Sequence, residues 1–157
     1  MKGIQRWNKV RQRLSSITAS GLDVSFISSP VHNKTYYSKI TIIFFQVKLN
    51  SEIIWRFPKD SEQPNYCNRD GNVCYYRGDW ITPEYPIHSI IKYLDLPKEQ
   101  LLHYEDIAGL ADILKVCDKR IGYERLKNIE LSNAAKQIFD ERFKEKLIKA
   151  NETSPSL

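Results

Sequence analysis

The sequence has no apolar run long enough to cross a membrane. Its longest apolar stretch, residues 40–45, is interrupted by Thr41 and falls far short of the roughly 20 residues of a spanning helix. The N-terminus is basic, but charges interrupt it up to Arg13, so it lacks the apolar segment of a signal peptide. The three cysteines cannot all pair within one chain, and they are Cys67, Cys74 and Cys117. We therefore expect a cytoplasmic protein with reduced thiols.

The sequence also lacks a recognisable catalytic motif. It contains no nucleophile elbow, no Walker loop and no dinucleotide fingerprint. A nucleophile, a base and an orienting acid can be drawn from two sets, Ser28, His32 and Asp60, or Cys117, His103 and Asp106. Any chain of this length offers such sets, so no catalytic residue is predicted. A small enzyme without a recognisable motif is the third of three functional hypotheses.

Acidic residues are missing from the first 22 positions. The chain has 157 residues, with 24 Lys and Arg against 19 Asp and Glu, for a formal charge of +5. The segment before Asp23 carries five of the basic residues, so the remainder is balanced at 19 against 19. Hydrophobic residues make up 41% of the chain and aromatic residues 11%, enough for one domain with a real core. The charge pattern therefore predicts one basic helix on a neutral body.

Hydrophobic periodicity predicts a helix followed by strands. An apolar stripe at three- and four-residue steps from Ile4 to Ile17 marks a helix that is expected to end at Ser20-Gly21, where Gly21 is suited to a left-handed cap. Strands are expected at 22–26, 36–49 and 53–57, separated by a loop at 30–34 and a turn at 50–52. Apolar residues on both parities at 40–45 favour a central strand covered on both faces.

The second half is expected to be helical after an irregular segment at 58–83. Asp70-Gly71 is a strong turn signal there, and an inserted hairpin or a long ordered loop both fit. Helices are then expected from Pro83, after Pro97, through 107–117, and after Ser132 as a cap, with a bend at Gly122. The fold class is therefore α+β, with an N-terminal helix and an antiparallel sheet of about three to five strands covered by C-terminal helices. We expect one domain over 1–150 and a disordered tail at 151–157.

Residues 7–10, residues 90–96, Ala111 and residues 118–126 carry a resemblance to a family of short bacterial proteins of unknown function. Trp7-Asn8-Lys9-Val10 matches the Trp-x-Lys-Val/Leu start of that family, and residues 118–126 match its Asp-Lys/Arg-Arg-x-Gly-x-x-Arg-Leu segment near the C-terminus. The sequence departs from the family at Tyr123 and Glu124, where the family is more basic, and residues 58–83 have no counterpart. The resemblance covers about half of the chain and implies a bacterial, cytosolic origin.

The match at 118–126 also contains the densest polar cluster of the helical half. On a helix, Arg120 and Glu124 are four residues apart and can pair. Arg120 and Arg125 are candidates for an anion or nucleic-acid contact. The alternative is a structural network that ties this segment to the sheet or to the first helix.

The basic face of the first helix is the second candidate for phosphate contacts. Its candidate contacts are Arg6, Lys9, Arg11 and Arg13, in a sequence without a helix-turn-helix, finger or RNP pattern. A solvated face is the ordinary origin of such a run. Nucleic-acid binding is therefore the second functional hypothesis.

Metal binding and cofactors are not predicted. Six residues separate Cys67 from Cys74, more than the two to four that usually separate a pair of zinc ligands, and His88 and His103 are not spaced as a helical pair. With Gly71 at the sixth position of a calcium loop, the first and last ligand positions fall on Tyr66 and Arg77, which cannot serve.

An aromatic and arginine-rich segment at 66–85 supports the leading hypothesis. Tyrosine, tryptophan and arginine dominate the energetic hot spots of protein interfaces. We therefore expect a non-catalytic protein that binds a protein partner, and an immunity or antidote role is one concrete form of this hypothesis. An aromatic cluster that packs under a long loop is the alternative. The candidate contact residues are Tyr66, Arg69, Tyr75, Tyr76, Arg77 and Trp80.

Overall fold

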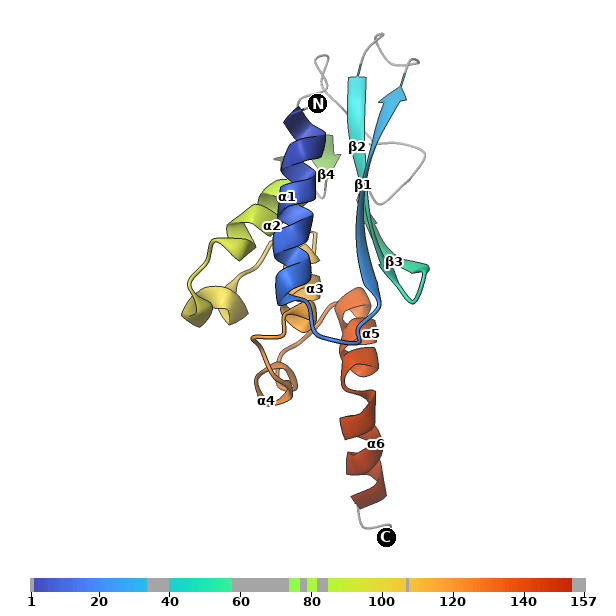
Figure 1. Ribbon diagram of the computed structural model, residues 1–157, viewed down its shortest axis with the longest axis vertical. Coiled ribbons are helices and arrows are strands. Elements are labelled where there is room, and N and C mark those ends of the chain that lie inside the picture. The colour runs from blue at the N-terminus through green and yellow to red at the C-terminus, as the bar shows by residue number, and fades with distance from the viewer. Residues whose placement is uncertain are drawn as a thin grey trace. The chain divides into compact units, whose positions relative to one another are not determined.

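The computed structural model has an α+β fold, with an N-terminal helix, a three-stranded antiparallel sheet and C-terminal helices (Figure 1). The fold class predicted from the sequence is thus confirmed. The structure describes the backbone of residues 2–33, 40–57, 74–76, 79–81, 85–106 and 108–153, and the side chains of 7–28, 45–57, 85–106 and 108–150.

The described chain divides into two compact units. The first contains Met1–Arg11 and Asp23–Lys92, and the second contains Gln12–Leu22 and Tyr93–Leu157. One boundary lies within helix α1 (Lys2–Ile17) and another within helix α2 (Tyr85–Leu94). The single domain expected over residues 1–150 stays a prediction.

The first unit is built on a sheet with the order β1-β2-β3. These strands are β1 (Val24–Asn33), β2 (Ile40–Leu49) and β3 (Glu52–Phe57), and all neighbours are antiparallel. The strand expected at 36–49 is therefore central. Whether both of its faces are covered between 40 and 44 concerns side chains outside the described set.

Aromatic side chains pack the inner face of this sheet. Phe45 is fully buried, and its ring lies 5.2 Å from that of Trp7 on α1 and 6.5 Å from that of Phe26 on β1. Phe57 continues the same face, because it pairs with Phe45 in the ladder, and its ring contacts Tyr85 at the start of α2 at 5.0 Å. Buried aromatic rings each remove a large apolar area from water, so this face is the core of the first unit.

The prediction of a loop at residues 30–34 is wrong for the first four of these residues. Pro30 and the three residues after it continue β1 and pair with β2, Pro30 opposite Ile43 and Asn33 opposite Ile40. Proline lacks a backbone donor, which normally ends a strand, but β1 is an edge strand of this sheet and one side of an edge needs no partner. Lys34 lies outside the described residues.

The turn between β2 and β3 is tighter than the expected three-residue turn. Leu49 pairs directly with Glu52, leaving Asn50 and Ser51 as the loop, with φ of 51° and 70°. Two successive positive φ values are the mark of a type I′ hairpin turn, whose twist matches that of the strands. Asparagine tolerates a positive φ, so Asn50 suits this conformation. Serine has a side chain that disfavours a positive φ, so the backbone at Ser51 is strained.

A second, smaller hairpin lies in the segment expected to be irregular. Strands β4 (Cys74–Tyr76) and β5 (Asp79–Ile81) pair with each other as a separate two-stranded sheet. The turn expected at Asp70-Gly71 lies outside the described residues.

In the second unit, α1 ends earlier than the sequence suggested. The Lys119 N–H donates to the Ile17 carbonyl at 2.7 Å, and the Ala19 N–H donates to the Cys117 carbonyl at 2.8 Å. These bonds draw the chain out of the helix after Ile17. Gly21 does adopt a left-handed φ of 79°, but it serves a turn after this bridge rather than capping the helix, which corrects the prediction.

The remaining helices follow the predicted order with more breaks. They are the 3-10 helix η1 (Lys98–His103), α3 (Leu110–Cys117), α4 (Tyr123–Leu126), α5 (Asn133–Arg142) and α6 (Lys144–Thr153). Ser132 caps α5 as predicted, since its hydroxyl accepts from the Ala135 N–H at 3.4 Å. The last expected helix is interrupted at Phe143, where φ and ψ are −111° and 21°.

Helix α6 extends into the segment expected to be a disordered tail. It continues through Thr153, so residues 151–153 are helical. Residues 154–157 lie outside the described chain.

Candidate functional site

The polar cluster predicted at residues 118–125 is centred on a buried carboxylate. Asp118 follows the last residue of α3 and has an exposed fraction of 0%. Its carboxylate accepts from the Tyr93 hydroxyl at 2.6 Å, from the Arg120 backbone N–H at 2.9 Å, and from the guanidinium of Arg120. A buried carboxylate needs such donors, because desolvating an unpaired charge costs several kcal/mol.

Arg120 forms a two-pronged contact with this carboxylate. Its Nε and Nη2 lie 2.9 Å and 2.7 Å from the two oxygens of Asp118, and these bonds raise the pKa of the guanidinium. The side chain of Arg120 is 29% exposed, whereas that of Asp118 is fully buried. The Nε and Nη2 edge of the guanidinium is therefore occupied by Asp118 and is not available to an external anion.

The predicted pairing of Arg120 with Glu124 is wrong. Residues 118–122 form a turn between α3 and α4 rather than a helix, so the two side chains are not on one helical face. Glu124 instead pairs with Lys127 at 2.6 Å, which lowers the pKa of Glu124 through a hydrogen bond from the ammonium group. Arg125 is exposed and takes no part in the cluster around Asp118.

Tyr93 brings the end of α2 to the same carboxylate. Burial, followed by the hydrogen bond to Asp118, raises the pKa of its hydroxyl well above the ordinary value. The hydroxyl therefore stays protonated and remains a donor to Asp118 throughout the neutral range. The ring of Tyr93 also lies 5.8 Å from that of Tyr104.

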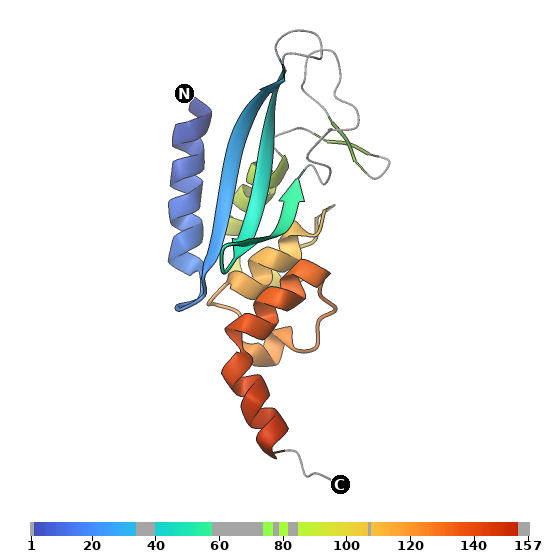
Figure 2. The ribbon, with the colours of Figure 1, turned by 90° about the vertical axis from the view of Figure 1, so that its right-hand side faces the viewer.

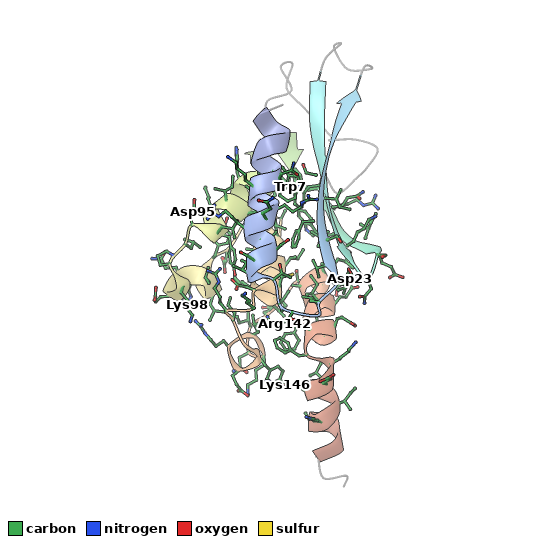
Figure 3. The ribbon with its side chains drawn as sticks, viewed as in Figure 1. Trp7, Asp23, Asp95, Lys98, Arg142 and Lys146 are labelled. Carbon is green, nitrogen blue, oxygen red and sulfur yellow. The ribbon has the colours of Figure 1, made fainter. Side chains whose placement is uncertain are left out.

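Arg142 is a member of this site that the sequence analysis missed. It lies at the end of α5 beside the loop between α3 and α4 (Figure 3). One amino group donates to the carbonyls of Val116 and Asp118, both at 3.0 Å, and the other donates to the carbonyl of Ile121 at 2.9 Å. The Val116 carbonyl lies in the last turn of α3 and the other two follow that helix, where backbone acceptors lack helical partners.

A sequence signal for Arg142 does exist. It is four residues after Ile138 and three after Phe139, both buried, so it falls on the apolar face of its helix. An arginine on such a face must find buried acceptors.

Cys117 is the neighbour of Asp118 in the chain, but its thiol is unreactive because it stays protonated. Burial raises the pKa of Cys117 to about 12, with a smaller contribution from the negative charge of Asp118. Since the thiolate is the nucleophilic form, Cys117 is poorly placed for nucleophilic chemistry. His103, proposed with it in one catalytic set, is exposed, whereas Cys117 is buried.

The arrangement supports the structural interpretation of this cluster. Within the described residues, no buried side-chain nitrogen or oxygen lacks a hydrogen-bond partner. Asp118, Tyr93, Arg120 and Arg142 join the ends of α2, α3 and α5 to the turn at 118–122, and the backbone bridge joins Thr18 to the same turn.

The segment expected to contact a protein partner is described only in its hairpin. Tyr75 stands directly opposite Trp80, and Tyr76 stands opposite Asp79. Tyr66, Arg69 and Arg77 lie outside the described residues, as do the side chains within the two strands.

The basic face of α1 is partly neutralised. Lys9 and Arg11 are exposed, and no described residue forms an ion pair with either. Arg13 donates to Asp95 at 2.7 Å, and the two side chains are 48% and 61% exposed. The side chain of Arg6 lies outside the described set.

Metal and membrane features can be assessed only for the described part of the chain. There, no group of three or more histidine, cysteine, aspartate or glutamate side chains is placed to hold a metal ion. The side chains of Cys67 and Cys74 lie outside it. No helix among the described residues is long and apolar enough to cross a bilayer.

No protein-family model, curated protein or solved structure matches this chain. The resemblance carried by residues 7–10 and 118–126 therefore stays a prediction.

Proposed function

We propose that this chain acts by binding another protein through residues 66–85, without catalysing a reaction. The observation that carries the proposal is the register of the β4–β5 hairpin, which sets Tyr75 directly opposite Trp80. Directly opposed positions share one face of a two-stranded ribbon, about 5 Å apart. Two residue types that dominate interface hot spots thus share one face.

The sheet arrangement adds to this support. Among the described strands, β4 and β5 pair only with each other and not with β1, β2 or β3. Each of the two strands therefore has one edge without a described partner strand. Such edges are used for partner binding because their backbone groups are available for hydrogen bonds.

The polar cluster around Asp118 gives no competing explanation of function. Its donors and acceptors are matched to each other, and its thiol is held protonated. These groups are engaged in the fold itself, so they add no support for a catalytic function.

A photo-crosslinking experiment tests the proposal. A photoreactive amino acid replaces Tyr76 in the full chain, the crosslinked protein is identified, and its binding is then measured with the purified partner. We expect Trp80→Ala and Tyr75→Ala to weaken binding by at least about tenfold. Ile148→Ala is the control, because Ile148 is an exposed apolar residue of the second unit. Equal binding by all four proteins would overturn the proposal.

An immunity or antidote role is the concrete form that we favour for this activity, acting in the cytoplasm. The free buried thiol of Cys117 is consistent with a reducing compartment. In that role the partner is a toxin, and co-expression of this chain should restore growth of cells that produce it. Trp80→Ala should abolish that rescue.

Nucleic-acid binding by α1 is the second candidate, favoured by the exposure of Lys9 and Arg11. The ion pair between Arg13 and Asp95 weakens it, because it removes one cation from the face. If this candidate is correct, binding to an oligonucleotide should fall steeply with salt, and Arg11→Ala should reduce the salt dependence.

A further inference from the structure

The outer face of the three-stranded sheet carries two cations among apolar residues. Alternation along the strands places Phe26, Phe45 and Val47 on the inner face and their neighbours on the outer one. In Figure 2 the sheet lies in front of α2, so the viewer sees the face turned away from that helix. The described outer-face residues that matter here are Ile27, Gln46, Lys48, Ile53 and Arg56.

The ladder register arranges these residues in two rows. Lys48 stands opposite Ile53, and Gln46 stands between Ile27 and Arg56. The register shifts between Val47 and Lys48, with Ile54 as the extra residue on β3, so Ile53 stands opposite Lys48 on this face, where it is 41% exposed. Neighbours within a row are about 5 Å apart and the rows about 7 Å apart, since each strand residue advances about 3.4 Å. The result is a small surface with isoleucines on both flanks.

The charge of this surface is unbalanced. Lys48 and Arg56 are both partly exposed, and neither forms an ion pair with a described residue. No acidic residue shares the face within the described strands. The solvent face of an antiparallel sheet is normally polar, so two isoleucines beside unpaired cations are unusual.

These properties indicate which kind of molecule would bind the outer face of the sheet. A second copy of this chain would bring two more cations against the first two, and like charges in an interface are unfavourable. Nucleic acid is bound on sheets through aromatic stacking, and none of the outer-face residues whose side chains the structure describes is aromatic. An amphipathic helix suits the surface, because its apolar stripe can cover Ile27 and Ile53 while flanking carboxylates reach Lys48 and Arg56.

We propose that the outer face of the sheet docks an acidic amphipathic helix of a partner protein. None of the residues that form this surface belongs to the segment 66–85, so the proposal goes beyond the function proposed above. The sheet supplies a rigid apolar platform, and the two cations set the orientation of the helix and exclude basic partners.

The probe is a synthetic amphipathic peptide with leucines at i, i+3, i+4 and i+7 and glutamates elsewhere. It is titrated into the isotope-labelled full chain and followed by amide chemical shifts. We expect the largest shifts at Ile27, Lys48, Ile53 and Arg56. A peptide with lysines in place of the glutamates should bind at least about tenfold more weakly.

Two double variants locate the binding surface. Lys48→Glu with Arg56→Glu should weaken the acidic peptide by at least about tenfold and favour the basic one, and Lys48→Gln with Arg56→Gln should have an intermediate effect. Lys98→Glu with Lys136→Glu makes the same charge change at exposed sites in the second unit and should leave binding unchanged. Trp80→Ala should also leave it unchanged, which separates this proposal from the function proposed above.

Three results would overturn the proposal. They are shifts confined to other residues, equal binding of the acidic and basic peptides, and tighter binding of oligouridine or anionic vesicles than of the acidic peptide at the same residues. The last would reassign the face to nucleic acid or to a lipid surface.

Discussion

Replacing Asp118 by asparagine tests the structural role of the buried carboxylate. The change keeps the shape of the side chain but removes its charge and turns one acceptor into a donor. Tyr93 can still donate to the remaining oxygen, whereas Arg120, which donates through two nitrogens, loses at least one of these bonds. We therefore expect a variant that folds but is less stable.

The magnitude follows from burial and geometry. Hydrogen bonds to charged groups contribute about 1.5–3 kcal/mol, and breaking a buried ion pair costs about 3–5 kcal/mol. Arg120 is 29% exposed and can be rehydrated, which reduces the loss. We expect Asp118→Asn to lower the free energy of unfolding by about 2–4 kcal/mol. Asp118→Ala should cost more, because the buried Tyr93 hydroxyl then has no acceptor there.

Chemical denaturation followed by far-UV circular dichroism is the appropriate assay, because the network lies among helices. Tryptophan fluorescence would report elsewhere, since Trp7, Trp55 and Trp80 all belong to the first unit. Asp95→Asn is the matched control, because Asp95 forms an exposed ion pair with Arg13 and should lose at most about 1 kcal/mol. Equal losses in Asp118→Asn and Asp95→Asn would refute the reasoning.

Three further predictions follow from the same structure. Arg142→Lys should lower the free energy of unfolding by about 2–4 kcal/mol, because the single nitrogen of lysine cannot replace the two guanidinium nitrogens that donate to three carbonyls. Arg125→Lys, at an exposed site, should have no effect in the same denaturation assay. Cys117 should contribute a loss of stability of up to about 1.4 kcal/mol per pH unit as the pH rises from about 9 to about 12, because the unfolded chain then loses a thiol proton that burial keeps on Cys117. The fall in stability over this range should therefore be shallower in Cys117→Ala. Ser51→Gly should stabilise the chain by about 1 kcal/mol, because it relieves a positive φ at the second position of the β2–β3 turn, and Ser51→Ala, which cannot relieve it, should bring no such gain on thermal unfolding.

Periodicity predicted the elements whose packing is local. The stripe containing Trp7, Val10 and Leu14 is buried on α1, and the cap at Ser132 forms as its residue type suggests. The central position of β2 also followed from its apolar composition. These features depend on the local spacing of apolar residues and on residue type, and both can be read from the sequence.

The errors arose where long-range contacts override local preference. Pro30 is tolerated in a strand because the edge position of β1 is a property of the sheet, which no local pattern reveals. The end of α1 is set by hydrogen bonds to residues 117 and 119, one hundred positions away. Arg120 pairs with Asp118 because the chain turns after α3. Residues four apart face each other only on a helix, and no helix connects Arg120 to Glu124.

The site was predicted in part. Asp118 and Arg120 were recognised as a polar cluster from residue type and spacing, but Tyr93 and Arg142 come from other elements, and only folding brings them to that cluster. The prediction of a contact surface at 66–85 stays a prediction, with its described part limited to the β4–β5 hairpin.

A binding titration of the crosslinked partner against the full chain, at low and at moderate salt, tests the central claim most directly. Binding through the aromatic segment predicts an affinity that changes little with salt and falls by at least about tenfold in Trp80→Ala. An affinity that falls by about a thousandfold with salt, and is equal in the wild type and in Trp80→Ala, would contradict the account and point to the basic face of α1.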